Sequence, residues 1–192
     1  MTRLLLILIL TFIFQTLAKA DDIRDFQIEG MGLGDSALDF FSKSVLEKNK
    51  ELEWYDTKVF TPIAELKLSD SKTYTSFQIA VKTKDKKYKI ESVEGFIFYK
   101  DEISKCYKKQ DSISKEIKEL FVNIKDLGKN TYKHSYDKTG KSKITDITLQ
   151  DTNRNEVVVA CYDWSDHLPY SDHLRISISS NEYSDWLRIS YD

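Results

Sequence analysis

The alternation of apolar and polar side chains along the chain predicts a protein rich in β-strands. Short runs with a period of two, bounded by turn residues, are typical of half-buried antiparallel strands. Such runs occupy Asp25–Glu29, Lys58–Leu68, Tyr74–Thr83, Tyr88–Tyr99, Tyr132–Tyr136, Lys143–Leu149, Glu156–Trp164, Leu174–Ser179 and Trp186–Tyr191. Pro62 in the second run predicts an edge strand or a bulge, and Gly95 in the fourth predicts a bulge.

Two other stretches have the spacing of amphipathic helices. In the segment 101–124, apolar residues recur three and four positions apart, with Asp101 as the expected N-cap and Gly128 as the expected C-terminal stop. An earlier helix is expected from Asp35 to about Lys50, after a glycine-rich turn, because Ser36 and Asp39 form a capping box.

These elements predict an α+β fold in which two helices pack on one face of a mostly antiparallel sheet. The sequence Ile28-Glu29-Gly30-Met31 has a counterpart in Val93-Glu94-Gly95-Phe96, and each precedes an expected helix. One alternative within this fold is therefore a tandem helix-plus-sheet repeat, with sub-units 21–94 and 95–192 inside a single domain spanning 21–192.

The first twenty residues have the pattern of a cleavable signal peptide. A basic start at Arg3 is followed by an apolar stretch and by a small-residue site that predicts cleavage near Ala20. The remaining chain contains no Asn-x-Ser/Thr glycosylation sequon, which favours the bacterial periplasm over a eukaryotic secretory route.

Two cysteines remain after cleavage, Cys106 and Cys161. In an exported protein an even pair predicts a disulfide. Cys106 falls on the apolar side of the expected helix and Cys161 in an apolar strand, which suits a helix-to-sheet bond. The alternatives are two buried thiols or a redox pair, although redox pairs normally occur as Cys-x-x-Cys.

The charge composition of the chain bears on which classes of partner it can bind. The chain has 29 basic and 31 acidic residues and a net charge of -2, and the signal peptide carries Arg3 and Lys19, so the exported part is mildly acidic. This balance argues against nucleic acid and against anionic membranes as partners. Beyond the signal peptide no apolar run is long enough to span a bilayer. We expect no cofactor and, without a catalytic motif, no enzyme.

The segment 163–173 is the densest polar cluster. Its metal-ligating side chains are candidates for a cation site: Asp163, Asp166, His167, Asp172 and His173. A hydrophilic hairpin loop is the simpler interpretation. The aromatic residues Trp164, Tyr170 and Trp186 near loop ends are candidates for partner binding, or they cap a small sheet.

Two resemblances bear on setting and fold. DIRDFQIEGMGLGDSALDFFS, YKDEISKCYKKQ and VVVACYDW resemble a group of small uncharacterised exported proteins of marine alphaproteobacteria, over most of the exported chain. That resemblance implies a periplasmic setting and no particular activity. The strand, turn and helix around Gly30 to Ser36 are similar to the opening unit of β-lactamase-inhibitor-like envelope modules, which implies a protein-binding fold by analogy.

The leading hypothesis from the sequence is a non-catalytic periplasmic interaction module with an unknown envelope protein as its partner. One alternative is a protein that binds a metal or a small ligand through the 163–173 loop. A second alternative is a hydrolase.

Overall fold

A computed structural model describes residues 22–52, 57–100 and 102–191 of the chain. The predicted signal peptide and its cleavage site lie outside these residues, as does the expected helix cap Asp101. Among the described residues, no helix combines the length and apolar character needed to cross a membrane.

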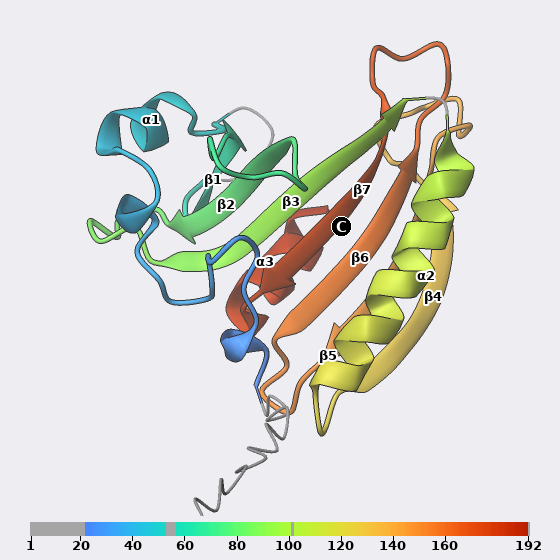
Figure 1. Ribbon diagram of the computed structural model, residues 1–192. Helices are drawn as coiled ribbons and strands as arrows, with labels where there is room; N and C mark the ends of the chain where they lie inside the picture. Colours follow the sequence, from blue (N-terminus) through green and yellow to red (C-terminus); the bar gives the residue numbers. More distant parts are fainter. Residues whose placement is uncertain (1–21, 53–56, 101, 192) are drawn as a thin grey trace, which may run out of the picture.

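The described part of the chain forms one seven-stranded antiparallel sheet in the order β1-β2-β3-β7-β6-β5-β4 (Figure 1). Its strands are β1 (Phe60–Leu66), β2 (Ser76–Lys82), β3 (Ile90–Lys100), β4 (Lys125–Lys133), β5 (Lys143–Gln150), β6 (Glu156–Asp163) and β7 (Asp172–Ser179). The predicted α+β class is confirmed. The proposed boundary between residues 94 and 95 falls inside β3, so the sheet is continuous across it, and the tandem repeat stays a prediction.

One face of this sheet is covered by helix α2 (Ile103–Leu120), which lies mainly over β6 and β7 (Figure 1). The shorter helix α1 (Lys43–Lys48) lies beside β1, and its Leu46 belongs to the same buried core as Cys106 and Ile117 of α2. The two predicted helices therefore share one face, which we call the α2 face. Strand residues that point into this core alternate along each strand, as in Val157, Val159 and Cys161.

A third helix, α3 (Asn181–Tyr191), packs on the opposite face, which we call the α3 face (Figure 1). Its Leu187 and Arg188 line a cavity together with Tyr162 of β6 and Arg175 of β7. The residues next to Tyr162 and Arg175 in their strands point to the α2 core, so Tyr162 and Arg175 themselves point to the α3 face. Tyr183 is buried against Phe60, with the two ring centroids 5.4 Å apart.

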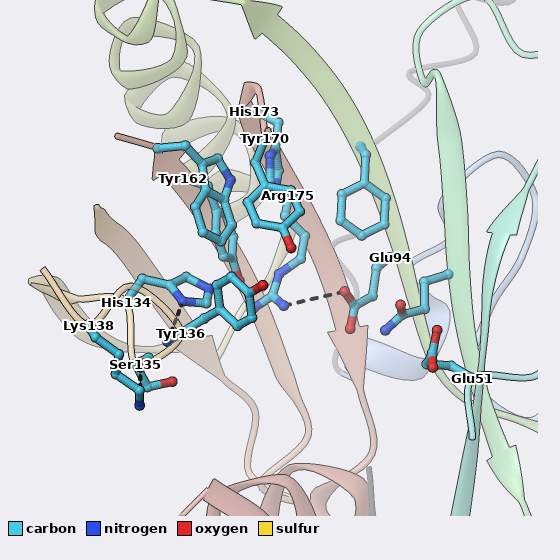
Figure 2. Close-up of a pocket in the computed structure, with 13 residues that line it drawn as sticks. Glu51, Glu94, His134, Ser135, Tyr136, Lys138, Tyr162, Tyr170, His173 and Arg175 are labelled. Atoms are coloured by element: carbon cyan, nitrogen blue, oxygen red, sulfur yellow. Dashed lines mark hydrogen bonds and ion pairs between the residues drawn. The ribbon is translucent and has the colours of Figure 1, made fainter. Parts of the chain in front are cut away.

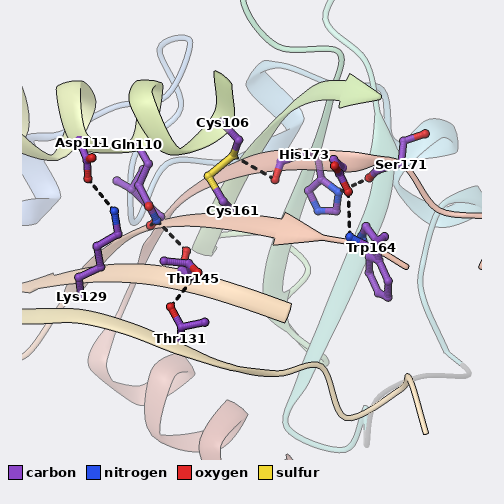
Figure 3. Close-up of a disulfide and its surroundings, with 12 residues drawn as sticks. Cys106, Gln110, Asp111, Lys129, Thr131, Thr145, Cys161, Trp164, Ser171 and His173 are labelled. Carbon is purple, nitrogen blue, oxygen red and sulfur yellow. Dashed lines mark hydrogen bonds and ion pairs between the residues drawn. A yellow bond between two sulfur atoms is a disulfide. The ribbon is translucent and has the colours of Figure 1, made fainter. Parts of the chain in front are cut away.

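Helix α2 is attached to the sheet by a covalent and a polar contact (Figure 3). Cys106 and Cys161 form the expected disulfide, and both side chains are fully buried. One turn further along α2, the Gln110 side chain donates two hydrogen bonds of 2.7 Å to the backbone carbonyls of Thr145 and Val159. The bond and the amide together fix both the position and the rotation of α2 on β5 and β6.

We expect loss of the disulfide to destabilise the protein strongly. The bond closes a loop with a sequence separation of 55, for which the chain-entropy model gives about 4 kcal/mol of unfolding free energy. Urea unfolding of the double variant Cys106→Ala/Cys161→Ala should show this loss, and the reduced wild-type protein serves as the control. Two free thiols in the denatured, unreduced wild-type protein would contradict the bond.

The predicted C-terminal strand Trp186–Tyr191 is wrong, because these residues belong to α3. The helix begins where the Ser180 hydroxyl accepts a hydrogen bond from the Tyr183 amide. Tyr183, Trp186 and Leu187 have helical spacing and pack together beside Phe60. An alternating pattern over six residues also fits part of a helix, and here the N-terminal cap and the apolar contact with β1 favour the helix.

The N-terminal predictions are correct only in part. Asp25–Glu29 is not a strand, since Ile28 makes a single bridge to Met31. The expected helix after the glycine-rich turn is divided into a short 3-10 turn, Ala37–Asp39, and α1. Ser36 caps the first piece, but Ser42 interrupts the helix and caps the second.

Two glycine predictions fail for identifiable reasons. Gly128 does not end α2, which stops at Leu120; it lies in β4 with φ +94° where the register of β4 against β5 shifts. Gly95 is not a bulge, since the register of β2 against β3 shifts at Ala80 and Val81 instead. Gly95 is needed because the Tyr74 ring covers it, and a Cβ there would lie 2.4 Å from the Tyr74 ring.

Pro62 lies in the edge strand β1, as predicted.

We expect Gly95→Ala to destabilise the protein by about 1–3 kcal/mol, because overpacking must displace the Tyr74 ring. Thermal or urea unfolding measures this cost. The substitution Tyr74→Ala should itself be destabilising, but in its background Gly95→Ala should cost much less. Equal costs in both backgrounds would show that the ring contact is not the cause.

Candidate functional site

The α3 face carries a cleft of about 550 Å³ near the end of the sheet where the β4–β5 turn and the β6–β7 loop meet (Figure 2). Its floor is formed by residues of β3, β6 and β7 that point away from the α2 face and alternate along each strand with residues of the α2 core. These floor residues are Glu94, Phe96, Tyr162, His173 and Arg175. Its rim comes from loops and contains Tyr136, Trp164 and Tyr170, with Glu51 on the far wall.

Seven ring side chains gather in this cleft, and we call them the aromatic cluster. They are Phe96, His134, Tyr136, Tyr162, Trp164, Tyr170 and His173. His173 stacks on Tyr162 with a centroid distance of 4.5 Å and an interplanar angle of 12°. Trp164 contacts both His134 and Tyr170, at 4.4 Å and 4.6 Å between centroids. The cluster thus links the sheet to both loops.

An ion pair between a buried carboxylate and a partly exposed arginine lies beside the aromatic cluster (Figure 2). Arg175 Nη1 is 3.5 Å from Glu94 Oε2, and its guanidinium also lies over the Tyr162 ring at 5.2 Å. Glu94 is only 4% exposed, and burial raises the pKa of its carboxyl although Arg175 acts in the opposite direction. Desolvating two charges in the middle of a sheet is costly, so the pair contributes little to stability.

The two histidines of the cleft are neutral at neutral pH. The pKa of His173 is lowered to about 4, chiefly by burial and also by the nearby Arg175, while the hydrogen bond with the Ser171 carbonyl acts in the opposite direction. Burial and Arg175 also lower the pKa of His134. The remaining ionisable side chains on the cleft wall, Glu51, Glu94, Lys138 and Arg175, have formal charges that cancel.

We expect the stability of the protein to fall as the pH is lowered from about 6.5 to about 4, because His173 binds a proton in the unfolded chain before it does so in the fold. Above that range its contribution is fully present. Unfolding free energies across the range measure the effect. His173→Phe keeps a stacked ring without a titrating group and should flatten this part of the profile. Half-protonation of native His173 near its ordinary pKa, seen by NMR, would contradict the prediction.

The two loops of the rim are joined through Asp137. Its buried carboxylate accepts hydrogen bonds from the amide and hydroxyl of Thr139 and of Ser142, at 2.7–2.9 Å. Burial raises the pKa of Asp137, but these hydrogen bonds outweigh it and hold the pKa well below its usual range. The Ser142 hydroxyl in turn accepts a hydrogen bond of 3.0 Å from the Ser165 amide of the β6–β7 loop.

The side chains predicted as metal ligands have separate partners. Asp172 accepts a hydrogen bond from the Trp164 amide, His167 pairs with Ser165, and His173 stacks in the aromatic cluster. Asp163 and Asp166 line another cavity together with Asp172. Among the residues that the structure describes, no group of three or more histidine, cysteine or acidic side chains is placed to hold a metal ion.

Of the three aromatic partner-binding candidates, the structure brings together Trp164 and Tyr170. Trp186 lies apart, with its ring centroid 5.4 Å from that of Phe60. Sequence reasoning missed Glu94 and Arg175, although each is a charged residue in the middle of a predicted strand. Tyr136 was missed as well, because its proximity to Tyr170 depends on how the β4–β5 turn folds back.

Comparison of the chain with protein-family models, with curated proteins and with solved structures finds no match. The two resemblances noted in the sequence therefore stay predictions, and the functional argument rests on the cleft.

Proposed function

We propose that the protein is a binding protein for a small, uncharged polar ligand that contains a ring, and that it holds this ligand in the cleft of the α3 face. The observation that carries the proposal is the aromatic cluster around the Glu94–Arg175 pair. A ring ligand can stack on exposed aromatic faces, while the charged pair orients its polar groups.

The size and charge of the cleft support this class of ligand. Its volume of about 550 Å³ lies within the usual range of small-molecule sites. Because the formal charges on its wall cancel and both histidines are neutral, the cleft offers no net field that would favour a strongly charged ligand. The rim residues Tyr136 and Tyr170 are 44% and 41% exposed, so their rings are accessible from solvent.

This proposal keeps the small-ligand alternative from the sequence, but it places the binding site in the cleft on the α3 face and not in the 163–173 loop. Trp164, Tyr170 and His173 of the 163–173 segment contribute, but the ligand lies against the sheet and not within the loop. The disulfide is compatible with an exported protein, which supports a role outside the cytoplasm. The interaction-module hypothesis shares Trp164 and Tyr170 with this proposal and differs in requiring a macromolecular partner.

We expect Tyr170→Ala to weaken ligand binding by about five- to tenfold, since loss of one aromatic stacking contact removes about 1–1.5 kcal/mol. The probe is a panel of sugars, nucleosides, indoles and amino acids, screened by ligand-observed NMR and followed by titration of tryptophan fluorescence.

The matched control is Tyr107→Ala, which removes a partly buried tyrosine ring on α2, at the other face of the sheet. It should leave binding unchanged. If no compound of the panel binds, or if Tyr107→Ala and Tyr170→Ala weaken binding equally, the proposed site is wrong.

A further inference from the structure

The cleft continues beyond the aromatic cluster along the α3 face. Two further cavities, of about 510 and 490 Å³, are also lined by Glu94 and Arg175. The first reaches from His134 and Tyr162 to Leu187 of α3. The three cavities share this ion pair and so adjoin one another from the β6–β7 loop to α3, and we call them together the groove.

The far end of the groove differs chemically from the aromatic end. Strands β4 to β7 present short polar side chains there: Asn130, Asp146, Thr148, Ser177 and Ser179. Glu156 and Arg188 pair on the same wall, so their charges compensate. The excess charge is that of Asp146, which disfavours an anionic ligand.

The buried atoms on the groove wall with unused hydrogen-bonding capacity include two acceptors and one indole donor. Glu94 Oε2 and Asp146 Oδ1 accept no hydrogen bond from the described part of the chain, and Trp164 Nε1 donates none. Buried polar atoms are normally paired, since an unmet acceptor or donor is costly. Asp146 lies at the polar end, Glu94 in the middle and Trp164 at the aromatic end, so the unmet groups are distributed along the groove.

We propose that the ligand of the groove is a neutral oligosaccharide; this inference rests on the proposed function and names its ligand class. A pyranose ring has an apolar face of C–H groups, which suits Trp164 and Tyr170, and hydroxyls that both donate and accept. Donors from successive sugar rings meet Glu94 and Asp146, and an acceptor meets Trp164. A chain of repeated units, without charge, matches both the length and the charge of the groove.

The test is isothermal titration calorimetry of the exported chain, with its disulfide intact, against the monomer, dimer, tetramer and hexamer of cello-, chito-, malto- and xylo-oligosaccharides. In at least one series we expect the affinity to rise by about tenfold or more from monomer to tetramer, since each added ring makes new contacts. An affinity independent of chain length overturns the inference.

Two variants at the polar end make the test specific. Thr148→Val and Asp146→Ala should each abolish the gain in affinity with chain length. Asp146→Ala also removes the hydrogen-bond partner of the Tyr132 side chain, so the melting temperature of each variant is measured as a control for folding. Tyr170→Ala should weaken every length, and Tyr107→Ala none. If both polar-end variants keep the length-dependent gain, the ligand does not extend along the groove.

The outcomes separate this inference from the proposed function. Binding of a nucleoside, indole or amino acid in the cleft, with no binding of any neutral sugar, overturns the oligosaccharide and leaves the small-ligand site in place. No binding by either panel overturns both.

Discussion

Side chains alternate between the two faces of a strand, and this alternation couples the core of the protein to its candidate site. The apolar residues that β6 and β7 place under α2, such as Cys161 and Leu174, determine which neighbours point the other way. Those neighbours include Tyr162 and Arg175. Since the disulfide and Gln110 hold α2 on one face of β5 and β6, they leave the opposite face of the sheet to form the floor of the cleft.

The Glu94–Arg175 pair is difficult to explain as a stabilising feature. Glu94 lies on β3 opposite Ser177, and Arg175 lies on β7 opposite Phe96, so the charges meet diagonally between adjacent central strands. Apolar residues at these two positions would pack without the cost of desolvating two charges. A groove that binds a polar ligand gives both charges a use, because the ligand supplies hydrogen bonds that the protein leaves unmade.

The sequence predicted local features well and long-range ones poorly. The strands β5, β6 and β7 follow from apolar and polar patterns within a few residues, and the disulfide follows from the presence of two cysteines in an exported chain. The strand predicted at Tyr132–Tyr136 overlaps β4 only at its end, because β4 runs from Lys125 to Lys133. Helix α3 was mistaken for a strand because the packing of Tyr183 and Trp186 on Phe60 of β1 decides its conformation. In the same way, Trp164 and Tyr170 were predicted as binding residues, but Glu94 was not, since only the pairing of β3 with β7 brings it to Arg175.

The floor and the rim of the cleft are supported by different kinds of structure, and this difference bears on how a ligand is held. Floor residues such as Tyr162 belong to central strands and are fixed by the ladder of backbone hydrogen bonds. Tyr136 and Tyr170 belong to two separate loops, which Asp137, Ser142 and Ser165 link by hydrogen bonds. For the proposed ligand, loops that are already tied together in the free protein would lower the entropy that binding must remove. In that proposal Asp137 is a positioning residue, because it links the rim loops but does not line the cleft.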